Sequence, residues 1–317
     1  MRTASVVIIG AGVIGASVAY HLARRGWREI LVLDRSVGPG QGSTGKATGG
    51  FRAQYATPIN VRLSLLSREK LRCFSDETGG DAGYVPAGYL WLASTARELE
   101  LLRAAQRVQH QEGLTEAVEV GTDEVRRINP AVALDEVIGG AFCPTDGFIN
   151  PVGIVEGYLA AARGLQVKLE WQVEVTGLRL EKDTRIAAVE TSRGPISAGA
   201  VVNAAGPWAA QVARWTGLDL PVVPLRRQVA VTAPTELLPE TMPMTIFTTD
   251  GFHLRVRNGR ILLLWPTPGA PGPPFDTAVD DEWIEAVVAK ARRRVPVVGR
   301  ASIDRHGCWA GLYEVSP

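Results

Sequence analysis

The sequence has little cysteine, no excess of charge of one sign and no long uninterrupted apolar run. Its cysteines, Cys73, Cys143 and Cys308, are odd in number and widely spaced, and they form no CxxC pair. This pattern argues against a disulfide framework and a zinc site, so we expect no metal and a reducing compartment, the cytoplasm. Lys plus Arg (34) nearly balance Asp plus Glu (33). We therefore expect no nucleic-acid partner, although a balanced net charge does not exclude local charged patches.

The apolar stretch 6–20 is the one segment that resembles a leader or a membrane anchor. It is interrupted by Gly10, Gly12 and Gly15 and contains fifteen residues. A membrane-spanning helix needs roughly 20. A small-residue cleavage site is also missing before the following polar residue. We expect neither a signal peptide nor a membrane span.

The composition is that of a globular chain with material for a core. Of 317 residues, 46% are hydrophobic and 21% charged. At roughly 150 residues per domain this makes one large domain or two ordinary ones. Hydrophobic periodicity then assigns the elements. It predicts helices over 13–25, 60–78, 95–112, 122–129, 151–163 and 280–294, and strands over 5–9, 29–34, 83–93, 140–150, 167–175, 176–181, 186–191, 198–203, 227–232, 252–257 and 260–265.

The first 34 residues form a complete strand–helix–strand unit with a glycine motif at its first turn. Gly10-x-Gly12-x-x-Gly15 follows the strand 5–9 and opens the helix 13–25. In this context Gly10 permits a tight turn, Gly12 lets backbone approach a pyrophosphate, and Gly15 lets helix and strand pack closely. Phosphate then binds the free amides and the positive dipole end of the helix.

A carboxylate closes this unit. Asp34 follows Gly15 by 19 residues, where it can accept hydrogen bonds from ribose hydroxyls. Arg35 beside it leaves the 2′-phosphate of NADP open as an alternative, because an arginine there accommodates that group. The motif predicts a dinucleotide but does not choose between nicotinamide and flavin.

Two further strings carry a family resemblance. Residues 42–52 read GSTGKATGGFR, a loop of backbone amides and hydroxyls, and residues 201–209 read VVNAAGPWA, a strand that breaks into small residues. With the glycine motif they resemble the FAD-dependent amino-acid oxidase family, which contains D-amino-acid oxidase, glycine oxidase and sarcosine oxidase. The strings are most similar to sarcosine oxidase β-subunit-like members, and the similarity covers essentially the whole chain, including CWAGLYEVSP at 308–317.

The resemblance implies a non-covalently bound FAD. Its adenosine would lie over the glycine motif and Asp34. Its pyrophosphate and flavin edge would lie along the second string, residues 42–52, and its other side against the third string, residues 201–209. The cofactor-binding residues implied are Gly10, Gly12, Val13, Ile14, Gly15, Asp34, Arg35, Gly42, Ser43, Thr44, Ala47, Thr48, Gly49, Gly50, Val175, Ala204, Ala205, Gly206 and Trp208. Cys308 lies several residues from the position at which relatives attach flavin covalently.

The fold class expected is α/β, with α+β character overall. A Rossmann-like FAD-binding domain would be interleaved with a mostly antiparallel-sheet substrate domain. The resemblance implies that residues 1–82, 151–217 and 302–317 form the first domain, and that 83–150 and 218–301 form the second.

The reaction implied is oxidation of the C–N bond of a small amino acid or secondary amine, sarcosine-, glycine- or proline-like. A hydride equivalent passes from the carbon beside nitrogen to flavin N5, and water hydrolyses the resulting imine. The protein must orient that C–H and keep the nitrogen neutral. Oxygen or another redox partner would accept the electrons.

The candidate substrate contacts come from four segments. Arg227 suits a substrate carboxylate, although two solvated arginines on a strand are the plainer interpretation. His253 stands where relatives often present a tyrosine, and Arg255 shares its face in a strand. Tyr313 replaces the carboxylate-clamping arginine of D-amino-acid and glycine oxidases, which favours secondary or N-methyl amino acids. Lys46 is placed to stabilise negative charge near the flavin, or else contacts phosphate or solvent.

Two other functions stay open. One is a non-catalytic or electron-transferring flavin-binding subunit of a hetero-oligomeric dehydrogenase. The other is an NADP-dependent dehydrogenase, for which Arg35 is the only support. Family members continue for some tens of residues beyond the WAGLYEVSP segment, with a strand and a helix that contact the flavin. The resemblance therefore also implies that a chain ending at Pro317 lacks part of the cofactor domain.

Overall fold

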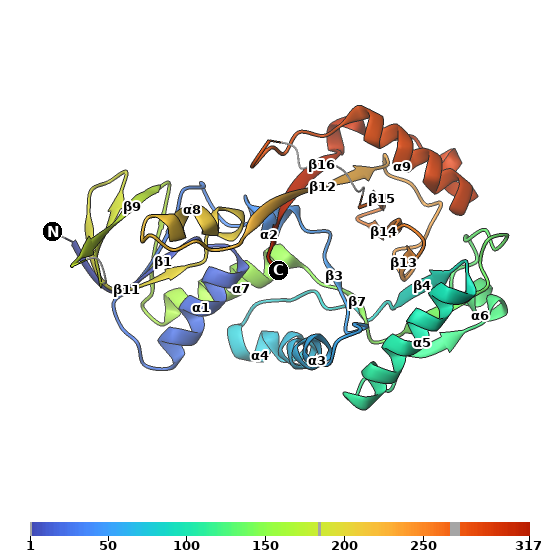
Figure 1. Ribbon diagram of the computed structural model, residues 1–317, viewed down its shortest axis with the longest axis horizontal. Coiled ribbons are helices and arrows are strands. Elements are labelled where there is room, and N and C mark those ends of the chain that lie inside the picture. The colour runs from blue at the N-terminus through green and yellow to red at the C-terminus, as the bar shows by residue number, and fades with distance from the viewer. Residues whose placement is uncertain (1, 183–184, 267–272) are drawn as a thin grey trace.

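The computed structural model describes residues 2–182, 185–266 and 273–317, and it contains two large sheets joined by helices and long strands (Figure 1). The predicted segment 218–301 therefore includes six residues, 267–272, that lie outside the described part of the chain, as do Met1 and residues 183–184. The mixed α/β class is confirmed.

The first sheet has six strands in the order β8-β2-β1-β11-β10-β9. Strands β8, β2, β1 and β11 are parallel, and β10 and β9 continue the sheet antiparallel. Because β1 is buried over Val6–Ile9, its sequence is continuously apolar. The strands are β1 (Arg2–Ile9), β2 (Ile30–Asp34), β8 (Lys168–Trp171), β9 (Val175–Glu181), β10 (Arg185–Thr191) and β11 (Ile196–Asn203).

Two helices cover one face of this sheet. Helix α1 (Val13–Arg24) and helix α7 (Pro151–Gly164) pack against each other, and Ala19 and Ala162 join Ile8 in one buried cluster. Small residues on both helices let them approach the sheet closely. The carboxyl ends of β1, β2 and β11 therefore meet at one edge, beside the start of α1.

The second sheet has eight strands in the order β16-β12-β15-β14-β13-β4-β6-β5. All neighbours are antiparallel except β13 and β4. In Figure 1 the long strands β12 and β16 lie side by side and extend between the two sheets. The strands are β4 (Tyr89–Ala93), β5 (Val118–Val120), β6 (Gly139–Cys143), β12 (Val223–Val231), β13 (Met244–Phe247), β14 (His253–Arg257), β15 (Arg260–Leu264) and β16 (Trp309–Val315).

The two faces of the second sheet differ. Helix α9 (Asp281–Arg294) covers one face, where Ile284 and Val287 pack on Leu254 and Leu263 in the largest core cluster. Strand alternation places His253 and its same-face neighbours on the opposite side, which faces the loop after β2. The other elements are α2 (Ser43–Lys46), α3 (Pro58–Arg72), α4 (Phe74–Thr78), α5 (Ala96–Gln111), α6 (Thr122–Ile128), α8 (Ala209–Arg214) and the short strands β3 (Gly50–Phe51) and β7 (Gly147–Phe148).

Several boundaries differ from the sequence prediction. The helix expected over 60–78 breaks at Cys73, which ends α3 and begins α4. The strand expected over 167–175 ends at Trp171, and the next begins only at Val175. Strand β16 pairs with β12 in the second sheet, and its Leu312 carbonyl accepts the Ser43 hydroxyl of α2. The division into two domains stays a prediction.

Candidate functional site

The turn that contains Gly10, Gly12 and Gly15 packs closely against the residue that follows β11, Ala204. Gly10 has φ +104°, and a Cβ there would overlap the carbonyl oxygen of Ala204. A Cβ on Gly15 would overlap the carbonyl oxygen of Gly10. In contrast, a Cβ on Gly12 would meet only the Thr44 hydroxyl, at 3.4 Å. Gly10 and Gly15 are thus required by packing, whereas Gly12 leaves the surface of the turn open to a ligand.

The N-terminus of α1 faces this opening. Gly12 caps the helix without a side-chain hydrogen bond, and the first turn carries no acidic residue. The Val13 amide donates to the Thr44 hydroxyl at 3.1 Å. Ile14 is 62% exposed, although it is a large apolar side chain. A helix start whose own N-cap residue provides no side-chain bond, beside an exposed apolar side chain, suits an anionic ligand with an apolar part.

Asp34 lies beside the same turn at the end of β2. Its carboxylate accepts the Ala11 amide at 2.7 Å and the Ser36 amide at 2.8 Å. The Val173 amide donates to the Asp34 carbonyl at 3.0 Å, which fixes the chain just before β9. Val175 begins β9, is partly buried and pairs with Thr191. These contacts hold the carboxylate within reach of the turn.

The third string completes this edge. Ala204 donates to the Ile9 carbonyl at 2.9 Å, and Gly206 follows Ala205 into a short 3-10 helix. Trp208 at the end of that helix stacks on Phe275 at 5.2 Å. The Arg35 guanidinium lies 4.1 Å from the centre of the Trp208 ring. Arg35, the one residue that favoured NADP, therefore has an aromatic partner.

The loop 42–50 is fixed between the two sheets. It begins at Gly42 with α2, where the Ser43 hydroxyl donates to the Leu312 carbonyl at 2.7 Å. Gly49 accepts the Ile149 amide at 2.8 Å, and Gly50 pairs with Phe148. Because the Val13 amide donates to the Thr44 hydroxyl, this loop also lies next to the glycine turn.

Two arginines of β14 hold the middle of this loop. Arg255 donates to the Thr48 carbonyl at 2.8 Å, and Arg257 donates to the Ala47 carbonyl at 3.1 Å. Arg255 also lies 3.5 Å from the centre of the Phe148 ring. Burial lowers its pKa to about 10. The guanidinium expected to meet substrate therefore contacts the loop, and it lines a groove of 690 Å³ beside it.

Arg227, Tyr313 and Lys46 gather at the strand pair β12–β16. Arg227 pairs with Gly311, and Tyr313 occupies the next position on that face. A Cβ on Gly311 would lie 2.8 Å from the Cβ of Lys46, so this face is turned toward α2. Tyr313 is 61% exposed. The neighbouring Arg226 is instead bound to Asp276 at 2.7 Å, on the other face.

His253 lies on the face of the second sheet opposite α9. Its Nδ1 is 2.8 Å from the Gly251 carbonyl oxygen. A carbonyl only accepts, so Nδ1 carries the proton and Nε2 is the acceptor nitrogen of a neutral ring. Burial, and then the charge of Arg52, lower the pKa of His253. The ring is therefore neutral at physiological pH.

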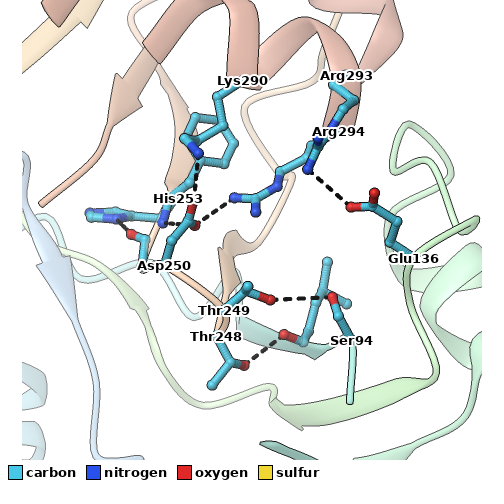
Figure 2. A network of polar contacts seen from close by, with 12 residues as sticks. Ser94, Glu136, Thr248, Thr249, Asp250, His253, Lys290, Arg293 and Arg294 are labelled. Atoms are coloured by element: carbon cyan, nitrogen blue, oxygen red, sulfur yellow. Dashed lines mark hydrogen bonds and ion pairs between the residues drawn. The ribbon is translucent and has the colours of Figure 1, made fainter. Parts of the chain in front are cut away.

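Figure 2 shows the network that fixes the turn before His253. Lys290 and Arg294 of α9 bind Asp250 at 2.6 and 2.7 Å. These bonds, with the Phe252 amide, lower the pKa of the Asp250 carboxyl against the opposing effect of burial. On the other side, Thr248 donates to the Leu92 carbonyl at 2.6 Å. The carbonyl that orients His253 thus belongs to a turn tied to both α9 and β4.

Arg52 is the functional candidate that sequence reasoning missed. Its guanidinium lies 4.6 Å from the centre of the Tyr55 ring and 5.4 Å from that of Trp91. Among the described residues its buried Nε has no hydrogen-bond partner, and neither has Nε1 of Trp91. Ile246 pairs with both Trp91 and His253, which places these two on one face. The signal was present, since Arg52 ends the string 42–52.

The described residues show two negative findings. They contain no group of three or more His, Cys, Asp or Glu placed to hold a metal ion. None of their helices is long and apolar enough to cross a membrane.

Comparison with known proteins agrees with this geometry. The family model "FAD dependent oxidoreductase" (DAO) matches residues 5–317. Dimethylglycine dehydrogenase of Rattus norvegicus is 28% identical over 320 residues, which are 95% of this chain and 37% of that protein. Sarcosine dehydrogenase of Mus musculus is 32% identical over 262 residues, 80% of this chain and 28% of that one. The chain thus spans little more than a third of the first of these relatives.

Among solved structures, L-proline dehydrogenase from P. horikoshii matches with a TM-score of 0.89 at 28% identity. The match covers 100% of this chain and 83% of that one. With the glycine turn, Asp34 and the loop 42–50 in place, the chain belongs to the DAO family of FAD dependent oxidoreductases.

Proposed function

We propose that this protein oxidises the C–N bond of a small amino acid that carries a carboxylate, a sarcosine- or proline-like secondary amine. The observation that carries the proposal is the buried Nε of Arg52, which has no hydrogen-bond partner among the described residues and lies beside a neutral His253. A buried donor without a partner is costly unless a ligand completes it. The names of the similar proteins, which include dimethylglycine, sarcosine and L-proline dehydrogenases, support this substrate class.

The residues at the first sheet fit a non-covalent FAD. The open surface at Gly12 would receive a pyrophosphate, Asp34 beside the turn would bind a ribose, and the exposed Ile14 would offer an apolar contact. A bound FAD would supply an acceptor for the hydride from the carbon beside the substrate nitrogen, which is the chemistry that oxidises a C–N bond. Lys46, Arg227 and Tyr313 would meet the flavin or the substrate from the β12–β16 face.

Arg52 and His253 would divide the recognition of the substrate. The guanidinium can form a two-pronged bond to a carboxylate. Nε2 of His253 can accept a hydrogen from the amine, because Nδ1 is committed to Gly251. The rings of Trp91 and Tyr55 lie against the Arg52 guanidinium and would shield it from water. This low-dielectric, positively charged surrounding disfavours a protonated amine, and the neutral amine is the form that can be oxidised.

The electron acceptor, the assembly and the compartment are further proposals. Oxygen or a second redox partner would reoxidise the flavin, and the protein would work alone or as a subunit of a hetero-oligomeric dehydrogenase. All three cysteines are free. This is consistent with a reducing cytoplasm.

The test is the visible absorption spectrum of the purified protein before and after anaerobic addition of sarcosine or proline. We expect the bands of oxidised flavin to bleach. In the Arg52→Met variant the KM should rise at least about tenfold, since a charged hydrogen bond is lost. Arg226→Met is the matched control, because that arginine is bound to Asp276 on the other face. A flavin that no carboxylate-bearing amine bleaches would refute the proposal and favour a non-catalytic subunit.

A further inference from the structure

We infer that Asp146 is a positioning residue, which holds Arg52 in the geometry that receives the substrate carboxylate. This inference rests on the proposed function. Asp146 touches neither the glycine turn nor the loop 42–50 through any of its hydrogen bonds in the described structure. It acts through the main chain that follows Arg52.

The geometry is direct. Asp146 is completely buried in the turn between β6 and β7. Its Oδ1 accepts the Ala53 amide at 2.7 Å, and its Oδ2 accepts the Gln54 amide at 3.3 Å. These are the two residues directly after Arg52. The Asp146 carbonyl in turn accepts the Gly88 amide at 2.8 Å, so the turn is anchored next to β4.

The carboxylate oxygens have few other uses. The nearby Arg68 is bound to Glu116 at 3.2 Å and to Thr145 at 2.6 Å. Both carboxylate oxygens of Asp146 thus accept hydrogen bonds from the backbone of residues 53–54. Two amides held by one carboxylate fix the direction in which the preceding residue leaves the strand β3. That residue is the arginine between Tyr55 and Trp91.

The charge of Asp146 is maintained against its surroundings. Burial raises the pKa of its carboxyl to about 6, against the opposing effects of the two amides and of Arg52 and Arg68. The other titratable groups that face it are Cys143, Tyr84 and Tyr89, which stay neutral near pH 7 because burial raises the pKa of each. Asp146 is thus ionised at neutral pH and becomes protonated in mildly acidic solution.

The direction in which acid changes the affinity for a carboxylate distinguishes protonation of Asp146 from protonation of His253. When Asp146 takes up a proton, the site also gains positive charge, but the carboxyl loses its hold on the amides of Ala53 and Gln54. We expect this loss of alignment to outweigh the added charge, as in Asp146→Asn, so carboxylate binding should become weaker. When His253 takes up a proton, the site gains positive charge, so carboxylate binding should become tighter. A loss of affinity toward acid therefore reports Asp146.

The experiment measures binding by calorimetry on the flavin-loaded protein, with 2-furoate as a carboxylate that cannot be oxidised and 2-furamide as its uncharged counterpart. Variants are Asp146→Asn, Arg52→Met and Thr232→Val. Thr232 is a matched control, because it is fully buried and its hydroxyl accepts the Ile261 amide at 3.0 Å in the same sheet. We expect Asp146→Asn to weaken 2-furoate about tenfold, since a charged hydrogen bond is misaligned, and to leave 2-furamide unchanged.

The outcomes distinguish failure of the proposed function from failure of the positioning role of Asp146. If Arg52→Met binds 2-furoate as the unmodified protein does, the proposed function fails. If Arg52→Met weakens it but Asp146→Asn does not differ from Thr232→Val, the positioning role alone fails. Should Asp146→Asn not fold, the unmodified protein still tests the inference. Its 2-furoate affinity must fall from about pH 8 to about pH 5, and a constant or rising affinity overturns the positioning role.

Discussion

The glycine turn offers a paired test in which two similar substitutions act through different causes. In Gly15→Ala, the new Cβ would lie 3.0 Å from the carbonyl carbon of Gly10, overlap its oxygen, and lie 3.3 Å from the Cβ of Ala204. Carbon atoms pack at about 3.5 Å or more, so backbone must move. Overpacking of this kind costs about 3 kcal/mol, and the better helix propensity of alanine offsets about 1 kcal/mol. We expect a net loss of about 2 kcal/mol.

Gly12→Ala is the control at the same turn. Its Cβ would meet only the Thr44 hydroxyl at 3.4 Å, so the flavin-free protein should lose no more than about 1 kcal/mol, the cost of a poorer helix cap. The methyl group would, however, occupy the open surface above the turn. Calorimetry of the flavin-free proteins should show Tm lower by about 3 °C for Gly15→Ala, given the entropy of unfolding of a chain this size. Both variants should retain less flavin than the unmodified protein. Equal Tm values for the two variants, or full flavin retention by Gly12→Ala, would refute the division of roles between these glycines.

Three further predictions concern buried charges. Arg255→Met should release more flavin on dialysis, because the bond to the Thr48 carbonyl that fixes the loop is lost; unchanged retention would count against this clamp. Arg294→Met should lower the free energy of unfolding by about 3 kcal/mol in urea titrations, since it removes one partner from the half-buried Asp250; a change within about 0.5 kcal/mol would contradict it. Since the pKa of Asp146 is raised to about 6, above its unfolded value, its contribution to stability is present at low pH and is lost as the pH rises through about 6. The stability of the unmodified protein relative to Asp146→Asn should therefore increase as the pH falls from about 7 to about 4, and a difference that does not vary with pH would exclude the titration.

The cofactor edge was predictable because its signals are local. Gly10, Gly12 and Gly15 stand at fixed short spacings, and a strand, a turn and a helix follow one another without interruption. Such a unit folds in the same way wherever it occurs, so residue types at those positions suffice to assign it. Asp34 follows from the length of the same unit.

The substrate side was less predictable because its residues come from separate segments. Arg52 was missed although the string 42–52 was recognised, since only the packing beside Tyr55 and Trp91 buries its Nε, which has no hydrogen-bond partner among the described residues. Arg255, the predicted substrate contact, also donates to the carbonyl of Thr48, a partner that the sequence did not indicate. A sequence shows that an arginine is present but does not show which acceptor it reaches.

The sequence by itself determined the α/β class, the dinucleotide turn and the family, because these depend on contacts between residues close along the chain. The tertiary structure alone decided that β16 joins β12, that Asp146 reaches the amides after Arg52, and that Gly251 orients His253. Asp146 lies 93 residues from its first amide partner. Contacts over such separations form only when both sheets pack, because burial then makes each unmet hydrogen bond costly.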